Sequence, residues 1–162
     1  HYWRDYNGVI PEDALPGGQN RDGDNIYIGQ VYVHGLGLCI APILPTKGTR
    51  EFYCRGDTFQ LTDAVKILCT KHSANFVWLP TSDLTFAEDT LNKNLVLGGR
   101  DGLATIHFDY YIGRIVFDGV VQIGIVDTFG EDMVYLYVVH NGVQYTDIKS
   151  FEVLVNERVN KE

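Results

Sequence analysis

Short runs of alternating apolar and polar residues dominate the chain. They are rich in β-branched and aromatic residues and end at Gly, Asn or Asp, which is the pattern of half-buried β-strands. The runs are IYIGQVYVHG (26–35), REFYC (50–54), FQLTDAVKIL (59–68), ATIHFDYYIGRIVF (104–117), VVQIGIV (120–126), MVYLYVVH (133–140) and SFEVLV (150–155). No stretch of eleven or more residues keeps the apolar spacing of an amphipathic helix. The sequence predicts an all-β protein with almost no helix.

The chain also contains an internal repeat. The segment YIGQVYVHG (27–35) recurs 84 residues later as YIGRIVFDG (111–119). A tryptophan and a pair of glycines precede each copy, and AVKIL (64–68) corresponds to SFEVL (150–154). We place repeat one at about 3–70 and repeat two at about 76–156. Repeats of this length bury their apolar faces against each other, so we expect one domain (1–162) built as a pseudo-twofold β-sandwich or prism-like unit.

Charge and hydropathy restrict the partners. The net charge of −8 repels nucleic acid and anionic lipid surfaces, and no basic run interrupts it. The longest apolar run, LGLCIAPIL (36–44), is far shorter than a membrane-spanning helix requires. We expect neither nucleic acid nor a membrane as partner. An extracellular, secreted protein is expected, with a cytoplasmic or vesicular location as the alternative.

The three cysteines, Cys39, Cys54 and Cys69, are too evenly spaced for a zinc site. One interpretation is a Cys39–Cys54 disulfide between neighbouring strands, with Cys69 as a free thiol. The alternative is three buried thiols that act as small hydrophobic side chains.

The segment GGQNRDGDN (17–25) precedes the first YIG strand and carries the first candidate ligands. Asn20 and Asp22 offer oxygens that can bind sugar hydroxyls, and Tyr27 and Tyr111 offer faces for stacking on a sugar ring. The alternative is a tight turn formed at Asp22-Gly23. A calcium loop is disfavoured because Gly23 precedes the third ligand position and no glutamate closes the loop.

The equivalent segment of repeat two, GGRDG (98–102), places a carboxylate at Asp101. Arg100 or Arg114 can hold this carboxylate for a ligand, or form a purely structural ion pair with it. We interpret Asp127, with Glu131 and Asp132, as part of a solvated turn. No nucleophile, metal-protease or phosphate-loop motif occurs in the sequence, so we expect no enzymatic activity and no cofactor.

Four segments together resemble the DM-nine repeat family of insects and molluscs. They are GVIPEDALPGG (8–18), RDGDNIYIGQ (21–30), YYIGR (110–114) and FEVL (151–154). The resemblance covers nearly the whole chain and implies two intertwined β repeats without catalytic activity. It also implies mannose-type glycan binding, of the kind used in innate recognition of microbial polysaccharide.

In mannose-binding members of that family, the resemblance points to an aspartate two residues after the paired glycines and a lysine after the YIG strand. The aspartate position is Asn20 in repeat one and Asp101 in repeat two, and the lysine position falls near Leu38 and Ile123. We therefore expect the Asp101 loop, with Arg100 and Arg114, to dominate any sugar binding. The alternative function is a structural or protein-interaction module with a degenerate sugar site, for which a homodimer is one form.

We predict that calcium changes neither stability nor ligand binding, because the loop at 20–24 lacks the spacing of a calcium site. Melting temperatures measured with calcium and with a chelator should coincide. A rise of several degrees in calcium would contradict this, because a ligand that binds only the folded state stabilises it.

Overall fold

The computed structural model describes residues 1–45, 51–61, 64–103, 108–128 and 133–157. Almost every regular element in these ranges is a strand, so the all-β prediction is confirmed. The strands are β1 (Tyr2–Asp5), β2 (Pro16–Gln19), β3 (Asn25–Val33), β4 (Gly37–Ile43), β5 (Glu51–Cys54), β6 (Asp57–Gln60), β7 (Val65–Cys69), β8 (Phe76–Ser82), β9 (Leu97–Asp101), β10 (Asp109–Phe117), β11 (Val120–Thr128), β12 (Val134–His140), β13 (Val143–Ile148) and β14 (Ser150–Asn156). A 3₁₀ turn, η1 (Ser73–Asn75), and one helical turn, α1 (Phe86–Asp89), complete the described elements.

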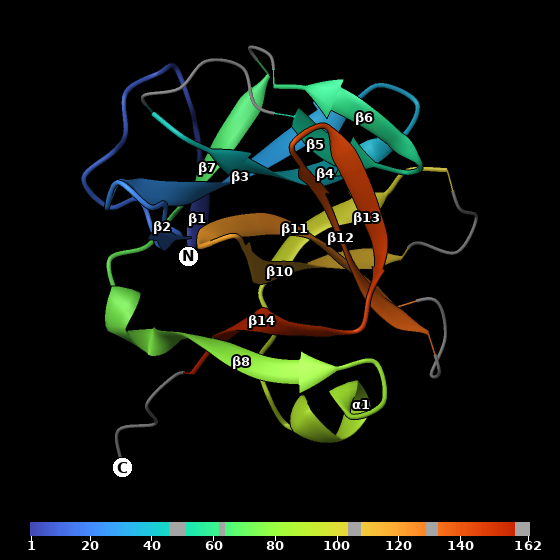
Figure 1. Ribbon diagram of the computed structural model, residues 1–162. Coiled ribbons are helices and arrows are strands. Elements are labelled where there is room, and N and C mark those ends of the chain that lie inside the picture. Colours follow the sequence, from blue (N-terminus) through green and yellow to red (C-terminus); the bar gives the residue numbers. More distant parts are fainter. Residues whose placement is uncertain (46–50, 62–63, 104–107, 129–132, 158–162) are drawn as a thin grey trace.

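Twelve of these strands form one antiparallel sheet, and β5 and β6 form a separate hairpin. The main path of the sheet runs β1-β7-β3-β4-β9-β10-β11-β12-β13; β2 pairs with β3, and β14 joins β10 to β8. Figure 1 shows β3, β4 and β7 above β10 and β11, with β14 and β8 below them. None of the described helical segments is long and apolar enough to cross a membrane.

The two halves of the chain repeat the same strand pairings. Gly29 of β3 lies opposite Ile67 of β7, and Gly113 of β10 lies opposite Val153 of β14. On the outer strands, Trp3 pairs with Leu68 and Trp78 pairs with Leu154. Trp3 and Trp78 therefore occupy corresponding places, and both are half-buried against the core.

The two halves are joined by a direct backbone pairing. Leu38 of β4, in the first half, lies opposite Arg100 of β9, in the second. Near this pairing, Gly17 of the first half lies against Ile123 of the second, and Gly98 of the second half lies against Ile40 of the first. A Cβ at Gly17 would lie 2.4 Å from the Ile123 side chain, and one at Gly98 would lie 2.6 Å from that of Ile40. Glycine is required at both positions because each half packs its isoleucine against the backbone of the other.

The cysteines follow the first of the two interpretations. Cys39 of β4 and Cys54 at the end of β5 form a disulfide with a Cα–Cα distance of 5.8 Å, and Cys69 of β7 is free and fully buried. In the second half, Gln122 and His140 stand at the corresponding places, and their side chains form a buried 2.8 Å hydrogen bond. The disulfide is compatible with an oxidising, extracellular environment.

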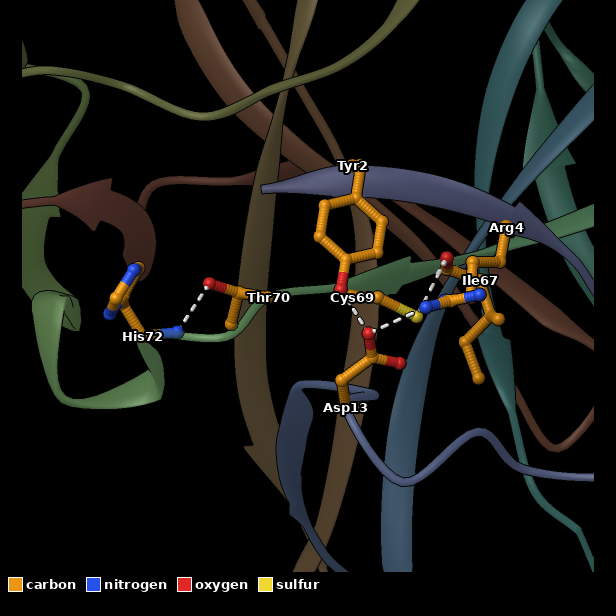
Figure 2. A network of polar contacts seen from close by, with 7 residues as sticks. All are labelled: Tyr2, Arg4, Asp13, Ile67, Cys69, Thr70 and His72. Atoms are coloured by element: carbon orange, nitrogen blue, oxygen red, sulfur yellow. Dashed lines mark hydrogen bonds and ion pairs between the residues drawn. The ribbon is translucent and has the colours of Figure 1, made fainter.

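A polar network fastens the segment before β2 to the edge of the sheet (Figure 2). The side chains of Tyr2 and Arg4, on β1, both donate to Oδ2 of Asp13. The backbone amide of Thr70 donates to the Asp13 carbonyl over 2.8 Å. The Tyr2 hydroxyl, followed by Arg4, lowers the pKa of Asp13 to about 2. The carboxylate is thus ionised over the whole physiological pH range.

We predict that Cys69 does not react with a maleimide in the folded protein and reacts fully in denaturant. Burial, reinforced by the nearby Asp13 carboxylate, raises the pKa of its thiol to about 11, so the reactive thiolate is scarce at neutral pH. Mass mapping without reductant should recover the Cys39–Cys54 link and label only Cys69. A Cys54–Cys69 link would contradict the structure.

Candidate functional site

A pocket of about 320 Å³ opens between the β5–β6 hairpin of the first half and strands β10 and β11 of the second. We call it the acidic pocket, and it is lined by Tyr53, Arg55, Gly56, Tyr110, Ile125 and Asp127. The hairpin is held in place by stacking of Tyr53 on Tyr137 of β12, with ring centres 5.0 Å apart. Gln144 of β13 also donates to the hydroxyl of Thr58 over 2.8 Å. The site exists only because hairpins from both halves meet.

Asp101, at the end of β9, pairs with Arg55 of this pocket, and both of its carboxylate oxygens have partners. It is 1 % exposed; its Oδ2 accepts a hydrogen bond from Nη1 of Arg55, and its Oδ1 accepts one from the Leu103 amide over 2.8 Å. A buried carboxylate requires such partners, because an unpaired buried charge is strongly destabilising. Asp101 therefore positions Arg55 and is not an open acceptor for a sugar hydroxyl.

Arg55 has an unusual backbone. Its φ is 47°, in the left-handed region, and Gly56 follows with φ 91°. Two successive positive φ values define a tight hairpin turn that favours Asn-Gly. The corresponding turn between β12 and β13 is Asn141-Gly142, with φ 49° and 75°. Arginine is unfavourable in the left-handed conformation. We attribute its presence here to its side chain, which reaches Asp101 and lines the pocket.

Asp127, on β11, is a buried carboxylate with an oxygen unsatisfied among the described residues. It is 4 % exposed, and its Oδ1 has no hydrogen-bond partner among the described residues. Our interpretation of this residue as part of a solvated turn is wrong, because β11 continues through it and turns its side chain inward. Glu131 and Asp132 lie outside the described residues.

The environment of Asp127 favours its neutral form. Burial, followed by the Asp101 charge, raises its pKa from 3.8 to about 6, and Arg55 and the Thr128 amide oppose this only in part. The folded state then binds the proton more tightly than the unfolded state. This group therefore makes the protein less stable as pH rises from about 4 to about 6. Asp127 is ionised at neutral pH at a cost to stability, which is typical of functional residues.

Tyrosines form much of the surrounding wall. Tyr53 and Tyr110 line the pocket, and Tyr137 supports Tyr53 from behind. Burial raises the pKa of all three phenols, to about 12 for Tyr137. The phenols are uncharged at neutral pH, so they add no charge to the pocket.

A second pocket lies at the place in the fold that corresponds to the acidic pocket, and its lining residues can be compared with those of the acidic pocket. It is lined by Pro42, Glu51, Gln60, Gln122, Val139, Asn141 and Gly142. The strand pairings make four of these positions the counterparts of acidic-pocket positions. Val139 corresponds to Tyr53, Asn141 to Arg55, Gly142 to Gly56, and Pro42 to Ile125.

The charged residues of the acidic pocket have no charged counterparts there. Leu44 corresponds to Asp127, and Asn20 to Asp101. The fold thus forms one such pocket without an acid or an arginine at these positions.

The loop of repeat one is a self-capped turn. Oδ1 of Asn20 accepts from the amides of Asp22 and Asp24, each over 3.0 Å, and the Asn20 amide donates to the Asp24 carbonyl. Nδ2 of Asn20 is buried without a partner among the described residues, and Asp22 is exposed. Asn20 and Asp22 do not join Asp101 in one site, because the two loops lie against different strands.

Neither predicted arginine holds Asp101; Arg55 does. Arg100 precedes Asp101 in β9, so its side chain points to the opposite face and pairs with Asp109 over 3.3 Å. Arg114 stacks 4.4 Å above the Trp78 ring, pairs with Glu152, and donates to the Gly17 carbonyl over 2.7 Å. Gln30, its counterpart in repeat one, donates to the Gly98 carbonyl. Arg114 therefore braces the two halves.

The predicted stacking residues are also elsewhere. Tyr27 and Tyr111 are half-buried and pack against the two core clusters, and neither lines the acidic pocket. The sequence analysis missed Tyr53, Arg55 and Tyr110 entirely. One signal was available: the turn CRGD (54–57) matches HNGV (140–143), with an arginine where a turn favours asparagine. No group of three metal-ligating side chains occurs in the described ranges.

We predict that Arg55→Met lowers the free energy of unfolding by about 3 kcal/mol, because it leaves the Asp101 charge buried and unpaired. This is the lower end of the usual range, since the Arg55 side chain is 36 % exposed. Arg100→Met is the matched control, and its exposed pair with Asp109 should contribute less than about 1 kcal/mol. Denaturant unfolding measures both. Equal effects would contradict the assignment of Arg55 as the partner of Asp101.

Comparisons with known proteins assign no family to the chain. No family model matches it, and no curated protein matches it. Functional inference therefore rests on the geometry of the acidic pocket and on the sequence resemblance.

Proposed function

We propose that the protein is a non-enzymatic, lectin-like module that binds one sugar ring of a glycan in the acidic pocket. The observation that carries the proposal is Oδ1 of Asp127, buried beside a pocket and without a partner among the described residues. An unsatisfied buried acceptor costs stability, and a ligand hydroxyl would satisfy it.

The rest of the pocket supports a sugar as the ligand. Tyr53 and Tyr110 provide aromatic rings, and Arg55 and Asp127 provide hydrogen-bonding groups beside them. A few directional polar groups among aromatic walls are typical of small-molecule sites. A volume of about 320 Å³ lies at the small end of such sites, which suits a single ring.

The resemblance to the DM-nine repeat family supports the same class of function. Within this proposal, the chain is a secreted member of that family that recognises mannose-type or microbial polysaccharide. The pocket differs from the expected loop site, because the residues that would contact sugar are Tyr53, Arg55, Tyr110 and Asp127 rather than Asn20, Asp22 and Asp101.

A protein-interaction module is the second candidate. Tyr32, on β3, is 58 % exposed and borders an apolar pocket of about 470 Å³ whose lining includes Tyr6, Leu38 and Val65. An exposed aromatic beside an apolar recess is typical of protein contacts, including contacts with a second copy of the chain. A protein that binds no sugar in the titration below would favour this function.

We predict that Asp127→Leu, which installs the residue found at the corresponding place in the first half, stabilises the protein and removes sugar binding. At pH 7 the free energy of unfolding should rise by about 2 kcal/mol, because the variant lacks the buried carboxyl group whose pKa is raised in the folded state. Calorimetric or NMR titration with mannose, glucose and mannan should show dissociation constants on the order of 1 mM for the wild type. The variant should bind at least about tenfold more weakly.

Glu51→Gln is the matched control, because it converts an acid to an amide in the related pocket and should leave sugar binding unchanged. Full sugar binding by Asp127→Leu would place the sugar site elsewhere. A loss of stability in Asp127→Leu would show that the Asp127 carboxylate is needed for folding.

A further inference from the structure

The charges of the acidic pocket do not balance at neutral pH. Arg55 is paired with Asp101, so one positive and one negative charge cancel. Asp127 then leaves one negative charge, and among the described groups that act on it Arg55 is the only cation. The remaining neighbours facing Asp127, Tyr53 on β5, Tyr110 on β10 and Tyr137 on β12, are neutral phenols. The pocket as a whole is therefore anionic.

The walls favour a cation over a neutral group. The faces of aromatic rings carry partial negative charge and attract an ammonium group, most strongly where water is excluded. Tyr53 and Tyr110 line the pocket, and the stacking of Tyr137 on Tyr53 fixes the orientation of the Tyr53 ring. Two tyrosine rings and a carboxylate thus border the same small space.

Oδ1 of Asp127 is the acceptor that such a cation would use. A charge-assisted hydrogen bond from an ammonium group is roughly twice as strong as one from a hydroxyl. A neutral sugar would leave the buried negative charge without a counter-ion, whereas an ammonium group would neutralise it. An anionic sugar would be repelled by Asp127, because Arg55 is already paired.

We propose that the pocket selects an amino sugar, a hexose ring that carries a free, protonated amine, over neutral or acidic sugars. This inference rests on the proposed function, since it names the class of glycan bound at the same site. The ammonium group binds Asp127 between the tyrosine faces, and the ring hydroxyls bind Arg55 and the phenols. Deacetylated hexosamine units of a polysaccharide carry this chemistry, while their N-acetylated forms lack the charge.

The test compares glucosamine, N-acetylglucosamine, glucose, glucuronic acid and ethylamine by calorimetric titration of the full chain at pH 7. Glucosamine should bind at least about tenfold more tightly than glucose, the ratio that one additional charge-assisted bond supplies. Glucuronic acid should bind most weakly. Ethylamine, which has the charge without the ring, should bind more weakly than glucosamine because it lacks the hydroxyl contacts.

Asp127→Asn keeps the shape of the side chain and removes its charge. It should reduce glucosamine affinity to the level of glucose and leave glucose affinity within about threefold of wild type. Glu51→Gln is again the control. A second measurement needs no variant. Glucosamine binding to the wild type should weaken as pH falls through about 6, where Asp127 is protonated, while glucose binding stays constant.

The outcomes separate the two proposals. If glucose binds as tightly as glucosamine, the selection for an amine is wrong and the glycan-binding function stands. Tighter binding of glucuronic acid would show that Arg55 is available to ligands and would overturn the charge argument. Equal binding of ethylamine and glucosamine would exclude a sugar-specific site. If none of the sugars binds, the proposed function fails as well.

Discussion

The pairing of β4 with β9 is the contact on which the candidate site depends. A Cβ at Gly99 would lie 2.2 Å from the Leu38 carbonyl oxygen, so the two backbones approach this closely only because the side chain is absent. This pairing joins the first half to the second and buries Asp101 at the end of β9. Arg55, on the β5–β6 hairpin, reaches Asp101 only because the halves are joined in this way.

At corresponding positions, the two halves join their strands through different side-chain interactions. The first half joins β4 to β5 with the Cys39–Cys54 disulfide, and the second half joins β11 to β12 with the Gln122–His140 hydrogen bond. The acidic pocket and its counterpart differ in the same manner. One contains Arg55 at the position where the other has Asn141, and Asp127 of the first corresponds to Leu44, which does not line the second. Because the two halves have similar folds, corresponding positions can be compared within one chain. Positions where the residue types differ are candidates for a function beyond folding.

Stability and the proposed function oppose each other at this pocket. Arg55 adopts a backbone conformation better suited to asparagine, and the buried Asp127 carboxylate lacks a full set of partners among the described residues. Each choice lowers stability, and the extensive strand pairing across the rest of the sheet tolerates both. Two other charged side chains are fully paired: Asp13 is held by Tyr2 and Arg4, and Arg114 by Glu152 and Gly17. Under the proposed function, a ligand would contact both Arg55 and Asp127.

The sequence by itself determined the all-β class, the repeat and the correspondence of Trp3 with Trp78, because alternation of apolar residues and recurrence of YIG are local signals. It also allowed the Cys39–Cys54 pairing as one of two interpretations. The tertiary structure alone decided the site. Whether Asp101 meets Arg55 or Arg100 depends on which face of β9 is buried and on which hairpin lies across it. The burial of Asp127 depends on strands distant in sequence. Arg55 and Asp101 pair across the interface between the halves, and a local sequence pattern cannot predict a contact between residues so far apart in the chain.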